Sequence, residues 1–142
     1  MTNIQVAVGC WSPEGSRVLL ARRPPGKDYP GCWEFPGGKL DPWEGPQVAL
    51  VREWKEELDL TVTAGVAVYL GTLTSPSGTR IELVAFRVHS VGLPVFRLRV
   101  HTEFCWVNPS SERDLTGLGS QVTPSTRPIC AALDRLTKFV AI

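Results

Sequence analysis

The sequence lacks any strong excess of charge. Among its 142 residues, lysine and arginine together number 15 and aspartate and glutamate 14, which gives a formal net charge of +1. A protein that binds long stretches of nucleic acid needs a basic surface to neutralise the phosphates. The near-neutral balance therefore argues against a nucleic-acid polymer as partner, whereas a mononucleotide is compatible with it.

Long apolar runs and closely spaced cysteines are also missing. No stretch approaches the ~20 apolar residues that cross a membrane, and the first residues lack the basic start and apolar run of a signal peptide. The cysteines, at positions 10, 32, 105 and 130, are too scattered for a typical zinc site or a framework of disulfides. We therefore expect reduced thiols, no membrane partner and a cytoplasmic location.

The apolar pattern predicts a single α/β domain over residues 1–142, without repeats or linkers. Runs rich in Val, Ile and Leu at 3–11 and 17–22 flank a turn with Pro and Gly, which predicts a β-hairpin. A second hairpin is predicted from 61–74 and 80–90, and both faces of its second strand are apolar enough to be covered. The pattern therefore predicts a mixed sheet between helices.

Helical spacing of apolar residues predicts two helices, one over 45–58 and one from about residue 127. The segment 23–32 holds so many prolines and glycines that we expect a loop. The remaining expected elements are short strands at 33–35, 96–100 and 103–107 and one helical turn within 109–115.

Three glutamates of the first predicted helix share one face. Glu53, Glu56 and Glu57 are spaced i, i+3 and i+4, so their carboxylates fall in one narrow sector beside the apolar stripe. Such carboxylates repel each other unless a cation offsets their charge, and hard oxygen ligands suit Mg²⁺ or Mn²⁺. Taken alone, the pattern is more typical of a solvated helix face.

The residues around these glutamates resemble the Nudix box. That motif reads Gly, five residues, Glu, seven residues, Arg-Glu, an apolar residue, any residue, Glu-Glu, any residue, Gly and an apolar residue. Six of its seven polar or glycine positions match, at Gly38, Glu44, Arg52, Glu53, Glu56 and Glu57. Asp59 replaces the second glycine, and Asp is among the few other residues that adopt the left-handed conformation expected at a helix end.

The resemblance continues outside the box, in residues 4–9, Arg22-Arg23 and 33–39, and is to the MutT type and the related CTP pyrophosphohydrolase type. It implies a Nudix-type α/β/α sandwich with a mixed β-sheet between helices. It also implies Mg²⁺ or Mn²⁺ as cofactor and a nucleoside triphosphate as substrate, hydrolysed to a monophosphate and pyrophosphate. We expect the protein to be a monomer or a weak homodimer.

The resemblance also implies roles for individual residues. The implied metal ligands are Glu53, Glu56 and Glu57, with the backbone carbonyl of Gly37 or Gly38 near the same ion and Glu44 behind them. Arg52 would orient the carboxylates by bidentate hydrogen bonds instead of touching phosphate. In the MutT type a glutamate outside the box acts near the metals, and Glu103 matches its place as metal ligand and base. Glu53 is the alternative general base.

Substrate contacts follow from the same resemblance. The implied set is Arg23 and Lys39 at the phosphates, with Ile4, Val6, Glu34 and Phe35 at the base or sugar. At the start of the last helix, MutT-type enzymes that hydrolyse 8-oxo-dGTP have Asn and the cytidine type has Asp, where this chain has Thr126. A hydroxyl makes fewer simultaneous hydrogen bonds than a carboxamide, so an altered or loose base preference is expected.

Sanitation of 8-oxo-dGTP is the first expectation, and hydrolysis of CTP, dCTP or 5-methyl-dCTP is the alternative. The segments 79–83 and 107–110 lean toward the cytidine type. The same metal site would also serve to cleave a nucleoside diphosphate sugar, a dinucleoside polyphosphate or a capped RNA end. A nucleotide-sensing domain without activity would be expected to have replaced the glutamates, and all three are present here.

Overall fold

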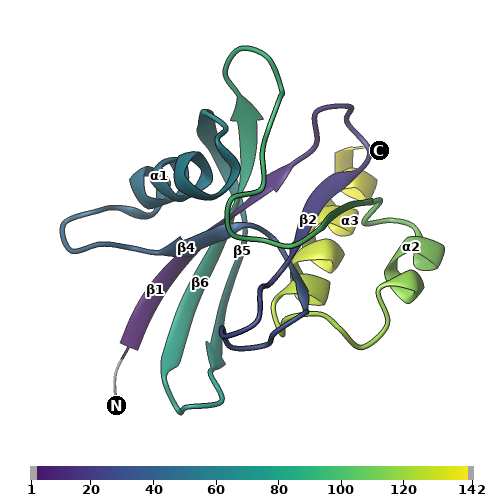
Figure 1. Ribbon diagram of the computed structural model, residues 1–142. Coiled ribbons are helices and arrows are strands. Elements are labelled where there is room, and N and C mark those ends of the chain that lie inside the picture. The colour runs from purple at the N-terminus through teal and green to yellow at the C-terminus, as the bar shows by residue number, and fades with distance from the viewer. Residues whose placement is uncertain (1–2, 141–142) are drawn as a thin grey trace.

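The computed structural model describes residues 3–140 and places two β-sheets between helices (Figure 1). The larger sheet has the order β4-β1-β6-β5, with β1 at Asn3–Trp11, β4 at Gly37–Lys39, β5 at Val62–Thr74 and β6 at Arg80–Ser90. The smaller has the order β3-β2-β7, with β2 at Val18–Arg22, β3 at Trp33–Glu34 and β7 at Phe104–Val107. The helices are α1 at Pro46–Leu58, α2 at Glu112–Gly117 and α3 at Thr126–Val140.

Strand pairing confirms a mixed sheet and corrects one predicted hairpin. β1 runs parallel to β6, while β4 and β5 run antiparallel to their neighbours. The hairpin of β5 and β6 is confirmed. The hairpin predicted from 3–11 and 17–22 is wrong, because the turn between β1 and β2 carries the chain into the second sheet, where β2 pairs with β3 and β7.

Most of the shorter predictions agree with the structure. The strands expected at 33–35 and 103–107 are β3 and β7, the helical turn is α2, and the C-terminal helix is α3. Within residues 3–140 no helix has the length and apolar character needed to cross a membrane. The cysteines are free thiols.

Helix α1 begins and ends as its sequence predicts. Pro46 occupies the first turn, where its missing N–H leaves no hydrogen bond unmade. Asp59 caps the other end in the left-handed conformation, with φ 52° and ψ 35°. Its carboxylate lies 3.3 Å from Lys55 Nζ and 3.1 Å from Arg99 Nη2. Asp59 thus adopts at the helix end the left-handed conformation that the sequence predicted for it.

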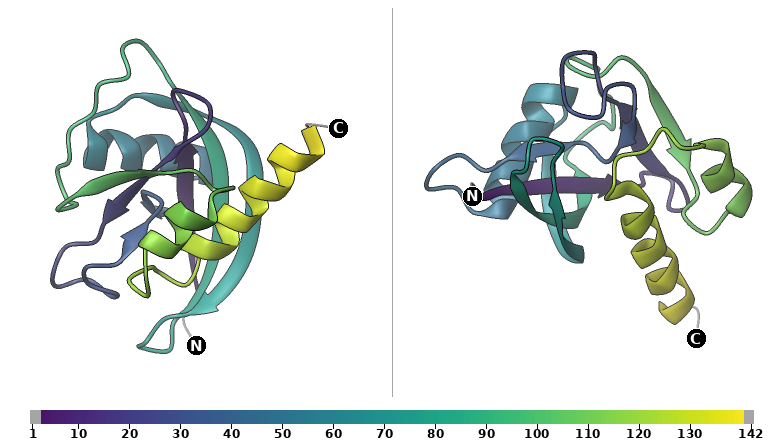
Figure 2. Two further views of the ribbon diagram at one scale, coloured as in Figure 1. Left: turned by 90° about the vertical axis from the view of Figure 1, so that its right-hand side faces the viewer. Right: turned by 90° about the horizontal axis from the view of Figure 1, so that it is seen from below.

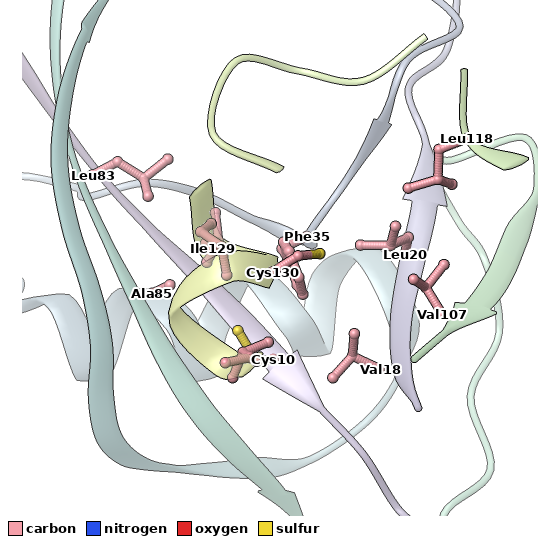
Figure 3. Close-up of a cluster of buried hydrophobic side chains, with 12 residues drawn as sticks. Cys10, Val18, Leu20, Phe35, Leu83, Ala85, Val107, Leu118, Ile129 and Cys130 are labelled. Carbon is pink, nitrogen blue, oxygen red and sulfur yellow. The ribbon is translucent and has the colours of Figure 1, made fainter. Parts of the chain in front are cut away.

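Two apolar cores lie on opposite faces of the sheets. The core beneath α3 contains Cys10, Leu20, Phe35, Leu83, Ala85, Ile129 and Cys130 among its buried members (Figure 3). The core beneath α1 contains Trp11, Leu19, Leu50, Trp54, Leu58, Phe86 and Val88. Alternate residues of β6 enter opposite cores, so both of its faces are covered as predicted, and α1 and α3 lie on either side of the sheets (Figure 2).

The strand predicted over 96–100 is wrong. We call residues 96–101 the strap, because this segment crosses the C-terminal end of α1 without joining a sheet. The N–H groups of Arg97 and Arg99 donate to the carbonyls of Leu58 and Glu57, at 2.8 and 2.9 Å. The last carbonyls of a helix lack partners within the helix. Here they accept from N–H groups of the strap that would otherwise pair with a neighbouring strand.

Candidate active site

A cavity of about 720 Å³ opens beside β1, β4 and β6 and the loop after β2. Its apolar lining includes Ile4, Val6, Phe35, Ile81 and Leu83, and its charged lining includes Arg23, Lys27, Glu34, Lys39, Glu53 and Glu57. An apolar wall suits a planar base, and cations suit phosphate groups. The cavity therefore combines the two kinds of surface that a nucleotide presents.

Two glycines of β4 bring α1 close to this cavity. Helix α1 lies on one face of the larger sheet, and the apolar wall of the cavity lies on the other face. Side chains of α1 must therefore pass the edge of the sheet to reach the cavity. A Cβ atom at Gly37 would clash with the carbonyl oxygen of Ala7, and one at Gly38 would clash with the carboxylate of Glu53. The missing side chain at Gly38 therefore gives Glu53 its path into the cavity, and the one at Gly37 lets β4 lie close against β1.

Glu53 and Glu57 meet at this edge of the cavity. The Glu57 Oε2 atom is buried and has no hydrogen-bond partner among the described residues. Burial, followed by the negative charges of Glu53 and Glu34, raises the pKa of Glu57 from 4.5 to about 8. A hard cation would offset this charge and complete the bonding of Oε2, so the oxygen donors present fit Mg²⁺ or Mn²⁺.

Glu56 faces away from the cavity. Its side chain is 58% exposed and accepts a 3.2 Å hydrogen bond from Arg52 Nη1. Within residues 3–140 no three His, Cys, Asp or Glu side chains converge in a geometry that would hold a metal. The structure therefore brings two of the three predicted box ligands together and leaves Glu56 on the arginine.

Arg52 connects the carboxylates of the motif. Its Nε and Nη2 atoms donate to the two oxygens of Glu44, at 2.7 and 2.8 Å, and Nη1 donates to Glu53 at 3.0 Å. The hydrogen bonds from Arg52 are the main reason that the pKa of Glu44 is lowered to about 2. Arg52 is not among the residues that line the cavity, so it touches carboxylates and not the space for a ligand.

Glu103 lies outside the cavity. Its side chain is 58% exposed and its carboxylate pairs with Arg22 Nη1 at 3.2 Å. Strand β7 begins only at Phe104, so Glu103 precedes the strand in which the sequence placed it. The strap instead contributes Val100 and His101 to the lining. The geometry therefore does not place Glu103 beside Glu53 and Glu57, where a metal ligand would have to lie.

The predicted substrate residues divide in the same way. The residues that line the cavity are Ile4, Val6, Arg23, Glu34, Phe35 and Lys39. Thr126 does not line the cavity, because it is fully buried and its Oγ1 donates to the carbonyl of Trp33 at 2.9 Å. Its neighbours Thr123 and Ser125 line the cavity instead. Thr126 thus anchors the start of α3, and the interpretation of this residue as the reader of the base is not supported by its position.

Two residues that the sequence did not single out support the site. Trp54 is fully buried in the core beneath α1, and its Nε1 donates to the carbonyl of Pro36 at 2.9 Å, which fixes the chain just before Gly37. His101 lies in the cavity wall with Nε2 3.0 Å from Glu34 Oε2. A lone histidine at the end of a strand-like segment gives no signal of a site in a single sequence, and the box pattern requires only an apolar residue at position 54.

Comparison with known proteins settles the family. The profile of the NUDIX domain matches residues 3–120. The chain belongs to the Nudix family. It is 36% identical over 109 residues to the CTP pyrophosphohydrolase of Escherichia coli strain K12, and the aligned region covers 77% of this chain and 78% of that protein. It is 42% identical over 60 residues to the 8-oxo-dGTP diphosphatase of Proteus vulgaris, which spans 42% of this chain and 54% of that protein.

Solved Nudix structures agree with this assignment. The solution structure of the E. coli ORF135 protein superposes with a TM-score of 0.79 at 33% identity, covering 96% of this chain and 92% of that one. The Nudix-type α/β/α sandwich that the motif implied is thereby confirmed. This Nudix chain is a hydrolase that acts on phosphoric anhydride bonds.

Proposed function

We propose that the protein is a metal-dependent nucleoside or deoxynucleoside triphosphate pyrophosphohydrolase that releases a nucleoside monophosphate and pyrophosphate. The observation that carries the proposal is the pair Glu53 and Glu57 at the edge of the 720 Å³ cavity, where the buried Glu57 Oε2 atom has no hydrogen-bond partner among the described residues. Arg23 and Lys39 line the same cavity and supply positive charge for phosphates. We further propose a cytoplasmic location for this activity, with the protein as a monomer or a weak homodimer.

The metal would be Mg²⁺ or Mn²⁺. Glu53, Glu57 and the carbonyl of Gly37 or Gly38 would hold it, and Glu56 would join them on giving up its contact with Arg52. When bound, the ion supplies charge neutralisation for the phosphate oxygens. Arg52 keeps Glu53 oriented through its 3.0 Å hydrogen bond.

Of the two carboxylates considered for the general base, we assign the role to Glu53, because it lines the cavity and Glu103 does not. Its carboxylate would take the proton of the attacking water. The comparison of Glu53→Gln with Glu103→Gln tests this. We expect kcat to fall by orders of magnitude in the first and to stay within a few-fold of the wild type in the second, since general bases contribute roughly 10²–10⁴-fold. A severe loss in Glu103→Gln would return the role to that residue.

For the nucleotide we propose 8-oxo-dGTP as the first candidate substrate. The apolar side chains of Ile4, Val6 and Phe35, with Glu34 beside them, would contact base and sugar. Because Thr126 is buried, the hydroxyl residues that this part of the chain contributes to the cavity are Thr123 and Ser125, just before α3. CTP, dCTP or 5-methyl-dCTP is the second candidate, supported by the 36% identity to a CTP pyrophosphohydrolase over 77% of the chain.

The test is the ratio kcat/KM across a panel with Mg²⁺. The panel contains 8-oxo-dGTP, dGTP, dCTP, 5-methyl-dCTP, CTP, UDP-glucose and diadenosine tetraphosphate. Preference for one triphosphate supports the proposal and identifies the base. Activity confined to UDP-glucose or the dinucleotide would move the protein to another branch of the family, and inactivity on every compound would favour a nucleotide-sensing domain.

A further inference from the structure

His101 is held in the cavity wall by a single side-chain contact. Its side chain is 2% exposed and its Nε2 lies 3.0 Å from Glu34 Oε2. An ionised carboxylate has no hydrogen and can only accept a hydrogen bond. In this contact Nε2 of His101 therefore carries the hydrogen and donates it to Glu34. This tautomer directs the imidazole toward Glu34 and leaves Nδ1 without a partner among the described residues.

Glu34 passes this contact on to Arg23. While Oε2 accepts from His101, Oε1 accepts a 2.8 Å hydrogen bond from Arg23 Nη1. The Arg23 and Glu34 side chains are 21% and 17% exposed and both line the cavity, so this ion pair is largely buried in the cavity wall. The three residues come from the strap, β3 and the loop after β2, and His101 is 67 residues from Glu34 in the sequence.

The strap fixes His101 relative to α1. Its backbone donates to the carbonyls of Glu57 and Leu58, and Arg99 pairs with Asp59 at 3.1 Å. Asp59 stands where the box has glycine, so the residue that departs from the motif supplies a side-chain link to the strap. The end of α1 that carries Glu57 is thereby joined, through the strap, His101 and Glu34, to Arg23.

We propose that His101 is a positioning residue that acts through Glu34 to hold the guanidinium group of Arg23 in place for the substrate phosphates. The inference rests on the phosphate-binding role of Arg23 in the proposed function. Arg23 is also held through Nε, which donates to the carbonyl of Asp28. The contact of Nη1 with Glu34 further reduces the rotamer freedom that the guanidinium group loses when it binds a ligand. The hydrogen bonds from His101 to Glu34 and from Arg23 to Glu34 are therefore expected to raise the affinity for the triphosphate.

The experiment measures the Kd of α,β-methylene-dGTP and α,β-methylene-dCTP with Mg²⁺ by calorimetry, using the tighter of the two. His101→Leu removes the donor to Glu34 and should weaken binding by about tenfold, in the range expected for losing a hydrogen bond to a charged group. His101→Gln retains an N–H donor and should recover most of the affinity. The matched control is His89→Leu, on an exposed position of β6 outside the cavity, which should bind as the wild type does.

A double-mutant cycle separates positioning from a general loss of structure. In an Arg23→Ala background, His101→Leu should weaken binding no further, because its effect passes through Arg23. Additive losses, or an unchanged Kd in His101→Leu alone, would overturn the inference. If Arg23→Ala itself leaves the Kd unchanged, the assigned role of Arg23 fails first. Should His101→Leu not fold, His101→Asn, whose amide is too short to reach Glu34, takes its place in the cycle.

Discussion

Glu57 combines burial, negative neighbours and an oxygen atom that has no hydrogen-bond partner within residues 3–140. Without a cation its pKa in the folded protein is about 8, compared with 4.5 for an ordinary glutamate. Because the folded-state pKa is the higher one, protonated Glu57 favours the fold at low pH. That contribution is lost as the pH rises from 4.5 through about 8. The metal-free protein should therefore lose stability from this residue over that pH window.

This linkage predicts how magnesium stabilises the protein. Below pH 8 the ion must displace a proton from Glu57, whereas above it the carboxylate is already ionised. We expect Mg²⁺ to raise the Tm more at pH 9 than at pH 6, relative to EDTA, in thermal melts followed by fluorescence. In Glu57→Gln the difference between the two pH values should shrink. Equal stabilisation of the wild type at both pH values would contradict the assignment of Glu57 as a ligand.

Replacing Glu57 also separates catalysis from folding. Glu57→Gln is nearly isosteric and removes a buried charge, so the free energy of unfolding in EDTA should be unchanged or higher at pH 9. We expect kcat to fall by orders of magnitude, because a metal ligand is lost. Glu112→Gln, at an exposed position of α2, is the control and should keep normal turnover. Near-normal kcat in Glu57→Gln would exclude Glu57 from the metal site.

Among single residues, Glu53 and Glu57 lie at the cavity as the box spacing predicts, whereas Glu56 turns to Arg52. The box spacing alone placed Glu53 and Glu57 on one helix face, because helical periodicity determines which residues share a face. The positions of Glu103 and Thr126 rested on matching segments without such a period. Both side chains are instead engaged by protein groups, Glu103 by Arg22 and Thr126 by the carbonyl of Trp33.

At the scale of elements, α1 is held against the sheet by Trp54. The indole is fully buried, packs edge-on against Trp11 at a centroid distance of 6.1 Å, and donates to the carbonyl of Pro36. A Cβ atom on Gly9 would lie 2.8 Å from its ring, so the strand beneath is shaped around it. Trp54 therefore helps to set the distance between α1 and the loop that leads into β4.

We expect Trp54→Leu to lower the free energy of unfolding by about 2–3 kcal/mol, somewhat less than the loss for a full truncation of a buried tryptophan. Urea denaturation followed by circular dichroism measures the change. Trp43→Leu is the matched control, because Trp43 is 103% exposed and its replacement should change stability by less than about 0.5 kcal/mol. A loss in Trp54→Leu no larger than in this control would show that the indole does not hold α1.

The strand pattern of the sequence predicted the elements and the pairing of β5 with β6, but not the partners of β2. The apolar pattern predicted β1 and β2 as strands. A turn between two strands, however, does not reveal whether they pair with each other. The strap has strand-like alternation, but the open carbonyls at the end of α1 capture its N–H groups. Both differences arise from long-range hydrogen bonding, which local periodicity cannot encode.

On the scale of the whole molecule, the cavity exists because separate parts of the chain converge. The sheet supplies the apolar wall, α1 supplies the carboxylates past the glycines of β4, and the strap and the start of α3 close the remaining sides. The α/β/α architecture followed from the motif, whereas this closure depends on how the two sheets are arranged. The central claim is that the assembled cavity hydrolyses a triphosphate to monophosphate and pyrophosphate with a divalent metal.

The most direct test is product analysis after incubation of the protein with 8-oxo-dGTP, dGTP and dCTP, with Mg²⁺ or with EDTA, using Glu57→Gln as the inactive control. The account predicts nucleoside monophosphate and pyrophosphate in equal amounts from at least one of these triphosphates, only when Mg²⁺ is present. Release of nucleoside diphosphate and phosphate, hydrolysis that persists in EDTA, or full activity of Glu57→Gln would contradict it.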